Sequence, residues 1–335
     1  MSEAQTRAAL DAYMRLQFGA ALGAMEPIGG GQSNPTFFIT VGKQRLVLRK
    51  QPHGPIVKGA HAVDREYRVL QALSKTDIPV PAPLHYCADP EILGTPFYVM
   101  ERIEGRVFHD AALSELTRDE RAALYHSMAE TLAKLHAVDP NDIGLSDFGR
   151  PGNYFERQLA RWSKQWDESS VPSIPALDHL IEALGRALPS DDGIVSIVHG
   201  DYRMGNLMVH PTEPRVIGIL DWELSTLGHP LADLGFAAMA WHTTPNDYGG
   251  IADLDFEGLG IPTKDVFISA YMSHSKNKLH LKPFHIAFAL FRFAVIFVGV
   301  AERARLGNAA GKNAAEIAPL AQRFAEIGLL IMRNG

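Results

Sequence analysis

The chain has 335 residues and a formal charge of −6, from 32 Lys and Arg against 38 Asp and Glu. Its 46% hydrophobic and 21% charged residues are typical of a globular protein and exclude a disordered, collagenous or coiled-coil chain. Because the chain has no net basic charge, we expect neither a nucleic-acid nor a membrane partner. The single cysteine, Cys87, favours a reducing, cytoplasmic location. Residues 1–18 predict a short amphipathic helix and no secretory signal.

The first hundred residues predict a small sheet with one helix. Gly42 and Lys43 separate two runs rich in β-branched and aromatic residues, which predicts a hairpin. Three prolines confine the segment after the helix to a sheet edge or an extended conformation. The expected elements are strands at 37–41 and 45–50, a helix at 61–74, and strands within 78–87 and 95–103.

After residue 103 the sequence is mainly helical. Thr117 and Glu120 form the pattern of a capping box before a helix that reaches His136. The apolar segment 284–300 predicts a buried helix, since it is shorter than the roughly 20 residues needed to span a bilayer. Loops are expected at 172–175 and 189–193, and short strands at 194–198, 207–210 and 216–220. We therefore divide the chain into a β-rich region, 1–103, and a helical region, 104–335.

One motif carries the chemistry. Asp201 follows a predicted strand, Asn206 comes five residues later, and Asp221 ends a second strand fifteen residues beyond that. Phosphoryl transfer needs a carboxylate beside the attacking hydroxyl, and a carboxylate and an amide that hold Mg²⁺ on the phosphates. Protein kinases place these groups with this spacing. A polar turn between two strands is the alternative interpretation.

The segment HGDYRMGN resembles the HGDxxxxN catalytic loop of the aminoglycoside phosphotransferase family. The most similar subgroup is the kinase domain joined to acyl-CoA dehydrogenase in family members ten and eleven. The resemblance implies an α+β, bilobal, protein-kinase-like fold with a β-rich N-terminal lobe, a larger helical lobe, and ATP and Mg²⁺ as cofactors. It makes Asp201 the catalytic base and Asn206 and Asp221 the metal ligands.

The glycine-rich segment 28–37 fits a loop that approaches phosphates closely, although a plain turn is an open alternative. A strand follows these glycines, which disfavours a dinucleotide-binding fingerprint, where a helix would follow. The resemblance places Ser33 and Asn34 over the β- and γ-phosphates.

The strand at 45–50 has two distinct faces. Alternation places Val47 and Arg49 on the face expected to line the nucleotide cleft. By resemblance Val47 contacts the adenine, and Arg49 stands where the family usually has a lysine for the α- and β-phosphates. Glu66, on the following helix, is its natural partner. Lys50 is the alternative cation.

The resemblance also assigns the adenine contact to the backbone at the end of the strand within 95–103. The expected groups are the carbonyl of Glu101 and the N–H of Ile103. An ordinary edge strand is the competing interpretation.

Three residues near the motif have predicted supporting roles. By resemblance, Asp233 accepts backbone N–H groups of the catalytic loop, and His199 shapes that loop. His136 is interpreted as a histidine that caps its helix. Tyr202 and Arg203 each have two open interpretations, a substrate contact and an exposed loop tip.

The acceptor is expected to be a small molecule. Only eleven residues separate Asp221 from Asp233, and no Ala-Pro-Glu of a peptide kinase follows. The helix expected behind the acceptor site carries basic and apolar residues, which suit an anionic or acyl substrate better than a polycation: Phe291, Arg292, Phe293, Arg303 and Arg305. The subgroup resemblance points the same way, toward a hydroxyacyl-CoA. An aminoglycoside kinase and a nucleotide-binding pseudokinase are the alternatives.

Overall fold

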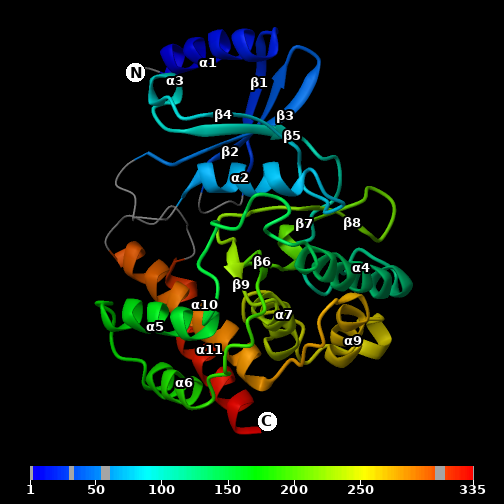
Figure 1. Ribbon diagram of the computed structural model, residues 1–335, viewed down its shortest axis with the longest axis vertical. Coiled ribbons are helices and arrows are strands. Elements are labelled where there is room, and N and C mark those ends of the chain that lie inside the picture. The colour runs from blue at the N-terminus through cyan, green and yellow to red at the C-terminus, as the bar shows by residue number, and fades with distance from the viewer. Residues whose placement is uncertain (1–2, 30–33, 54–60, 306–313, 335) are drawn as a thin grey trace. The chain divides into compact units, whose positions relative to one another are not determined.

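The computed structural model describes residues 3–29, 34–53, 61–305 and 314–334 (Figure 1). They form two compact units, Met1–Gly105 with Ile217–Ser225, and Arg106–Val216 with Thr226–Gly335. The chain therefore returns to the first unit at Ile217–Ser225. The expected division into 1–103 and 104–335 assigns these residues to the helical region.

The first unit is built on a five-stranded antiparallel sheet of order β1-β2-β3-β5-β4. Gly42, with a φ of 60°, and Lys43 turn the predicted hairpin between β2 and β3. The proline-containing β4 lies at an edge, as expected. β1 was not predicted. The strands are β1 (Leu22–Pro27), β2 (Thr36–Val41), β3 (Gln44–Lys50), β4 (Pro83–Cys87) and β5 (Phe97–Glu101).

Helices lie on both faces of this sheet (Figure 1). α1 (Glu3–Phe18) and the short α3 (Pro90–Leu93) lie on one face, and α2 (Val63–Leu73) packs on β4 and β5 on the other. The core beneath α1 contains its own Leu10 and Met14 together with Leu46 and Leu48 of β3. The alternation of β3 therefore leaves Arg49 for the α2 face.

The second unit is mainly helical. Its principal helices are α4 (Arg118–His136), α5 (Tyr154–Asp167), α6 (Pro175–Arg186), α7 (Leu231–Ala238), α8 (Phe256–Leu259), α9 (Lys264–His274), α10 (Pro283–Arg305) and α11 (Ala314–Asn334). Thr117 and Glu120 form the predicted capping box of α4. The short strands are β6 (Ser196–Val198), β7 (Leu207–Val209) and β9 (Thr226–Gly228), and β8 (Val216–Ile219) starts here. β6 pairs antiparallel with β9.

α10 is the central helix of this unit. It packs mainly on α11 and α7, and also on α5 and α6. Among the described residues, Pro283–Glu302 is the only helical segment long and apolar enough to cross a membrane, with a mean hydropathy of 2.1. However, 78% of that stretch is buried inside the protein, as a core helix is. The expected burial of 284–300 is thus confirmed.

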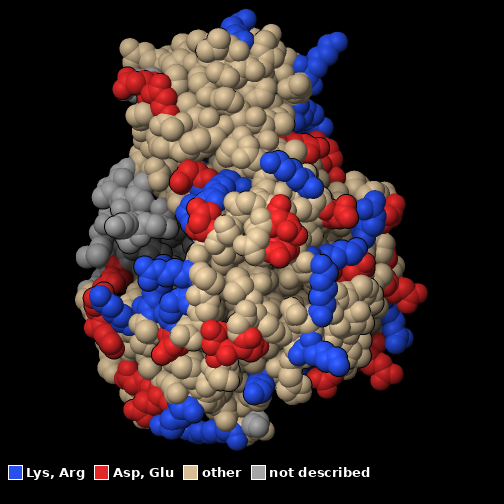
Figure 2. Space-filling model, viewed as in Figure 1, with Lys and Arg blue, Asp and Glu red and all other residues tan. Residues whose placement is uncertain are grey.

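Charged side chains of both signs are interspersed on the face shown in Figure 2. No large field of one sign dominates this face. The net charge of −6 is therefore not gathered into one region there.

Candidate functional site

A buried carboxylate holds the predicted catalytic loop between β6 and β7. Asp233, on the first turn of α7, accepts the backbone N–H groups of His199 at 2.6 Å and Gly200 at 2.8 Å. His136 Nε2 lies 3.2 Å from the same carboxylate. Burial by itself would raise the pKa of Asp233, but the partners, led by His136, outweigh it and lower the pKa below 3.8. The expected support by Asp233 is confirmed.

Replacing Asp233 with Asn should lower the free energy of unfolding by about 1.5–3 kcal/mol, because a charge-assisted acceptor of two backbone N–H groups is lost. The pKa of Asp233 is lowered in the folded state, so its contribution is complete above pH 3.8 and declines as pH falls through the folded value. Urea unfolding from pH 7 to pH 2 measures the difference between wild type and variant. A difference that grows on acidification would contradict this assignment.

Asp201 and Asn206 are hydrogen-bonded to each other, and both lie in the second unit of the chain. The Asn206 amide nitrogen donates to the Asp201 carbonyl oxygen at 2.9 Å and to its Oδ2 at 2.8 Å. Arg203 Nε lies 3.3 Å from Asp201 Oδ1, and the Asp201 side chain is 18% exposed. The 3-10 helix η1 (Met204–Asn206) makes this return of the chain possible. The carboxylate is therefore oriented and still accessible.

Other buried groups fix the same loop. The Asp201 N–H donates to His199 Nδ1 at 3.1 Å, and His199 is fully buried, as its predicted structural role requires. Tyr202 is also fully buried, and its hydroxyl donates to the carbonyl of Met128. Both interpretations of Tyr202, a substrate contact and an exposed tip, are therefore wrong.

Two further residues were misassigned from sequence. The interpretation of His136 as a helix cap is wrong, since its ring joins Asp233 to the Tyr271 hydroxyl, 2.7 Å from Nδ1. Arg292 does not line an acceptor surface: it is buried and donates to the Gly200 carbonyl. A histidine or arginine within an apolar stripe is the only sequence signal for such contacts. Phe291 is fully buried, and the Arg303 side chain lies outside the described residues.

In the first unit, Arg49 is the centre of an acidic cluster. Its Nε lies 2.8 Å from Glu66 Oε2, and its Nη2 lies 2.5 Å from Asp221 Oδ1 and 3.8 Å from Glu223 Oε2. Burial disfavours the charged guanidinium, but Glu66 and Asp221 more than offset this and raise the pKa of Arg49. The expected pair of Arg49 with Glu66 is therefore present.

Lys50 faces the other way. Its ammonium group lies 2.9 Å from His53 Nε2 and 3.3 Å from the Leu93 carbonyl, and it is almost fully buried. Burial lowers the pKa of Lys50. Lys50 therefore does not take the place of Arg49 beside Glu66.

Glu66 organises the remaining polar groups of this cluster. It is 1% exposed and accepts hydrogen bonds from the Asn34 amide at 2.5 Å and the Tyr98 hydroxyl at 3.0 Å. Burial raises the pKa of Glu66, while Arg49 acts in the opposite direction. The Asn34 side chain also contacts His61 and is buried, so it is engaged with α2 and its surroundings. Ser33 lies outside the described residues.

The two predicted metal ligands belong to different units. Asp221 follows β8, has a φ of 64° and is 34% exposed. The amide nitrogen of Asn206 is engaged by Asp201, so its amide oxygen is the group with which it would bind a cation. No group of three or more His, Cys, Asp or Glu residues suited to a metal occurs in the described part of the chain. Each of the two side chains offers an oxygen of the kind that Mg²⁺ prefers.

Of the residues predicted to contact adenine, Val47 lies on β3, the middle strand of the sheet, and Glu101 and Ile103 lie at and just beyond the end of β5. Val47 is buried and pairs with Phe38 and Met100. Glu101 ends β5 and is exposed, and Ile103 lies just beyond the strand. Their contacts with a nucleotide stay predictions.

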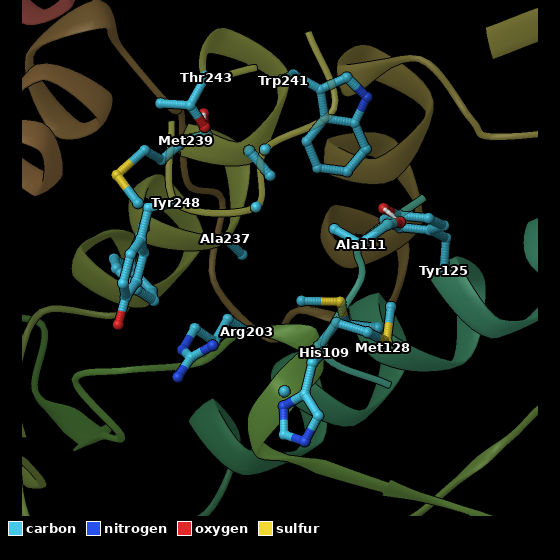
Figure 3. A pocket seen from close by; sticks show the side chains of 16 residues that line it. His109, Ala111, Tyr125, Met128, Arg203, Ala237, Met239, Trp241, Thr243 and Tyr248 are labelled. Carbon is cyan, nitrogen blue, oxygen red and sulfur yellow. Dashed lines mark hydrogen bonds between the residues drawn. The ribbon is translucent and has the colours of Figure 1, made fainter. Parts of the chain in front are cut away.

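A pocket that sequence reasoning missed lies beside the catalytic loop, within the second unit (Figure 3). It encloses about 620 Å³ of empty space, including the part open to solvent. Arg203 and His109 lie on one side, and Trp241 and Tyr125 on the opposite side. The residues come from the segment before α4, from α4, the loop between β6 and β7, α7 and the segment after it, so no local pattern could indicate them.

Comparison with known proteins shows the family of the chain. A profile of the phosphotransferase enzyme family matches residues 24–272. Acyl-CoA dehydrogenase family member 11 of Gallus gallus is 44% identical over 312 residues, which are 91% of this chain and 40% of that protein. The chain thus spans well under half the length of that relative.

Solved structures show the same architecture. A Ralstonia eutropha protein, provisionally described as an aminoglycoside phosphotransferase, is 42% identical with a TM-score of 0.87, over 98% of both chains. Aminoglycoside phosphotransferase APH(4)-Ia, solved with ADP and hygromycin B, is 14% identical with a TM-score of 0.66, over 98% of this chain and 99% of that one. The expected kinase-like α+β fold, with a sheet in the N-terminal region and helices in the C-terminal region, is confirmed. The chain belongs to the phosphotransferase enzyme family.

Proposed function

We propose that this chain transfers the γ-phosphoryl group of ATP to a hydroxyl of a small molecule, with Mg²⁺ as the metal. The observation that carries the proposal is the catalytic loop. Asp201 is oriented by Asn206, remains accessible, and belongs to a loop whose backbone is held by the buried Asp233. Such an arrangement fits a carboxylate that must meet an incoming hydroxyl.

In this mechanism Asp201 orients the acceptor hydroxyl and accepts its proton as the phosphoryl group is transferred. Asn206 keeps the carboxylate in one rotamer through its amide N–H. Arg49, paired with Glu66, supplies fixed positive charge for the nucleotide phosphates. Asn206 and Asp221 would hold Mg²⁺, whose charge favours transfer by neutralising the phosphate oxygens.

Among small hydroxyl compounds, we infer that a hydroxyacyl thioester is a better acceptor than an amino sugar. The support is the similarity to proteins named for acyl-CoA dehydrogenation, although the chain spans only 40% of such a relative. An aminoglycoside is the other acceptor class, supported by the fold shared with APH(4)-Ia.

Calorimetric titration with Mg-ATP, followed by measurement of ADP release with a panel of hydroxylated metabolites, tests the proposal. We expect saturable binding of Mg-ATP, and ADP release that depends on the acceptor and yields a phosphorylated product by mass spectrometry. Binding without turnover on any acceptor would overturn the proposal in favour of a nucleotide-binding pseudokinase.

A further inference from the structure

We propose that the pocket beside the catalytic loop holds an alkyl or aryl part of the acceptor, and that the acceptor also carries an anionic group that pairs with Arg203. This inference rests on the proposed function, because it names the chemical class of the molecule that receives the phosphoryl group. The class is a hydroxylated, predominantly apolar anion.

The lining of the pocket is mostly apolar. Aromatic rings and thioethers dominate it, among them Tyr125, Trp241 and Met128 (Figure 3). The polar atoms of the two rings are already engaged elsewhere: the Tyr125 hydroxyl donates to the Ala111 carbonyl, and the Trp241 N–H donates to the Pro262 carbonyl. The rings therefore offer carbon faces to an occupant, which favours hydrocarbon over a polar sugar.

The charge at the pocket selects against a polycation. No Asp or Glu occurs among the described residues that line the pocket. Arg203 and His109 both line it. Ammonium groups that enter the pocket would lose hydration and meet no carboxylate among the residues that line it. A carboxylate or similar anion would gain a charge-assisted contact with the guanidinium of Arg203.

Arg203 also connects the pocket to the reacting group. The same side chain lines the pocket, lies 3.3 Å from Asp201 Oδ1 through its Nε, and has its guanidinium 5.5 Å from the ring centre of Tyr248. Met204 and Gly205, the next residues of the catalytic loop, line the pocket as well. An occupant is therefore held against the loop that carries the catalytic carboxylate, which makes the pocket an acceptor subsite.

Binding can be tested without turnover. Decanoate, which has an alkyl chain and a carboxylate but no hydroxyl to phosphorylate, is titrated into the full chain and followed by calorimetry and tryptophan fluorescence. We expect saturable binding of decanoate and none of acetate at the same concentration. Ala111→Phe, which places a ring into the pocket from a loop, should weaken decanoate binding at least about tenfold.

Ala112→Phe is the matched control, since Ala112 is the adjacent loop residue, is also half-buried and does not line the pocket. It should bind decanoate like wild type. Tyr248→Ala is a second pocket variant, at a partly exposed residue, and it also should weaken decanoate binding. It serves as the test if Ala111→Phe does not fold. Equal decanoate affinity in wild type and both pocket variants would overturn the inference.

Turnover then separates this inference from the proposed function. With 3-hydroxyalkanoates of four to twelve carbons, KM should fall by about fourfold for each methylene that the pocket buries, from about 0.8 kcal/mol per CH₂. A KM independent of chain length would overturn the acceptor role of the pocket while kinase activity stands. Decanoate binding without phosphorylation of any alcohol would overturn the proposed function and, with it, the acceptor role.

Discussion

The Asp201→Asn variant is expected to turn over ATP about 10²- to 10⁴-fold more slowly than wild type, the usual contribution of a general base. The amide keeps the size of the side chain and an oxygen for the Asn206 N–H, but it cannot accept the proton of the acceptor hydroxyl. Because the loop is also held by Asp233, the fold and the affinity for ATP should change little. Single-turnover kinetics and calorimetric ATP titration measure the two effects separately.

The same Asp to Asn change at residue 178 is the control. Asp178, an exposed residue of α6, accepts a hydrogen bond from the Trp166 indole at 2.7 Å and lies outside the catalytic loop. Asp178→Asn should turn over like wild type. Full turnover by a folded Asp201→Asn variant would remove Asp201 from the mechanism.

The parts of the fold that sequence predicts well are those fixed by local rules. The turn at Gly42 and Lys43 and the capping box of Thr117 with Glu120 depend on residues close in the chain. The opposite faces of Arg49 and Lys50 follow from strand alternation alone.

The residues that were misjudged depend on contacts across the fold. Tyr202 looks like an exposed loop residue until its hydroxyl is seen to reach the carbonyl of Met128 on α4. His136 and Arg292 lie in helices far along the chain from the loop that they support. No periodicity indicates such contacts, because they are set by how helices pack and not by the sequence around each residue.

The candidate site shows the same limit. The spacing of Asp201 and Asn206 was sufficient to indicate that they act together, and their hydrogen bonds agree with it. The pocket beside them could not be predicted, since its walls come from segments more than a hundred residues apart that carry ordinary core residues such as Tyr125 and Trp241. A Met or aromatic residue has the same pattern in a core and in a binding pocket.

Replacing Arg49 with Met should lower the free energy of unfolding by about 3–5 kcal/mol, the cost of leaving one partner of a buried ion pair without the other. The stranded group is Glu66, which is 1% exposed. Arg45 on the same strand provides the control: it pairs with Glu104 at 3.0 Å, but both side chains are more than half exposed. Arg45→Met should therefore cost only about 0–1 kcal/mol in urea unfolding.

The pH dependence tests the cause of this loss. Burial already raises the pKa of Glu66, and without Arg49 the pKa should rise further. A carboxyl whose folded pKa lies above its unfolded value stabilises the fold below the unfolded value, and this stabilisation disappears as pH rises through the folded one. Arg49→Met should thus recover stability relative to wild type as pH is lowered from 8 toward 5.

A second substitution separates charge from packing. In Arg49→Met with Glu66→Gln, the buried group is a neutral amide, so the loss of stability should be smaller than in Arg49→Met alone and should no longer change with pH in this range. Its affinity for Mg-ATP should remain low, because the cation proposed for the phosphates is still absent. Wild-type ATP affinity in both Arg49 variants would leave Arg49 a purely structural role.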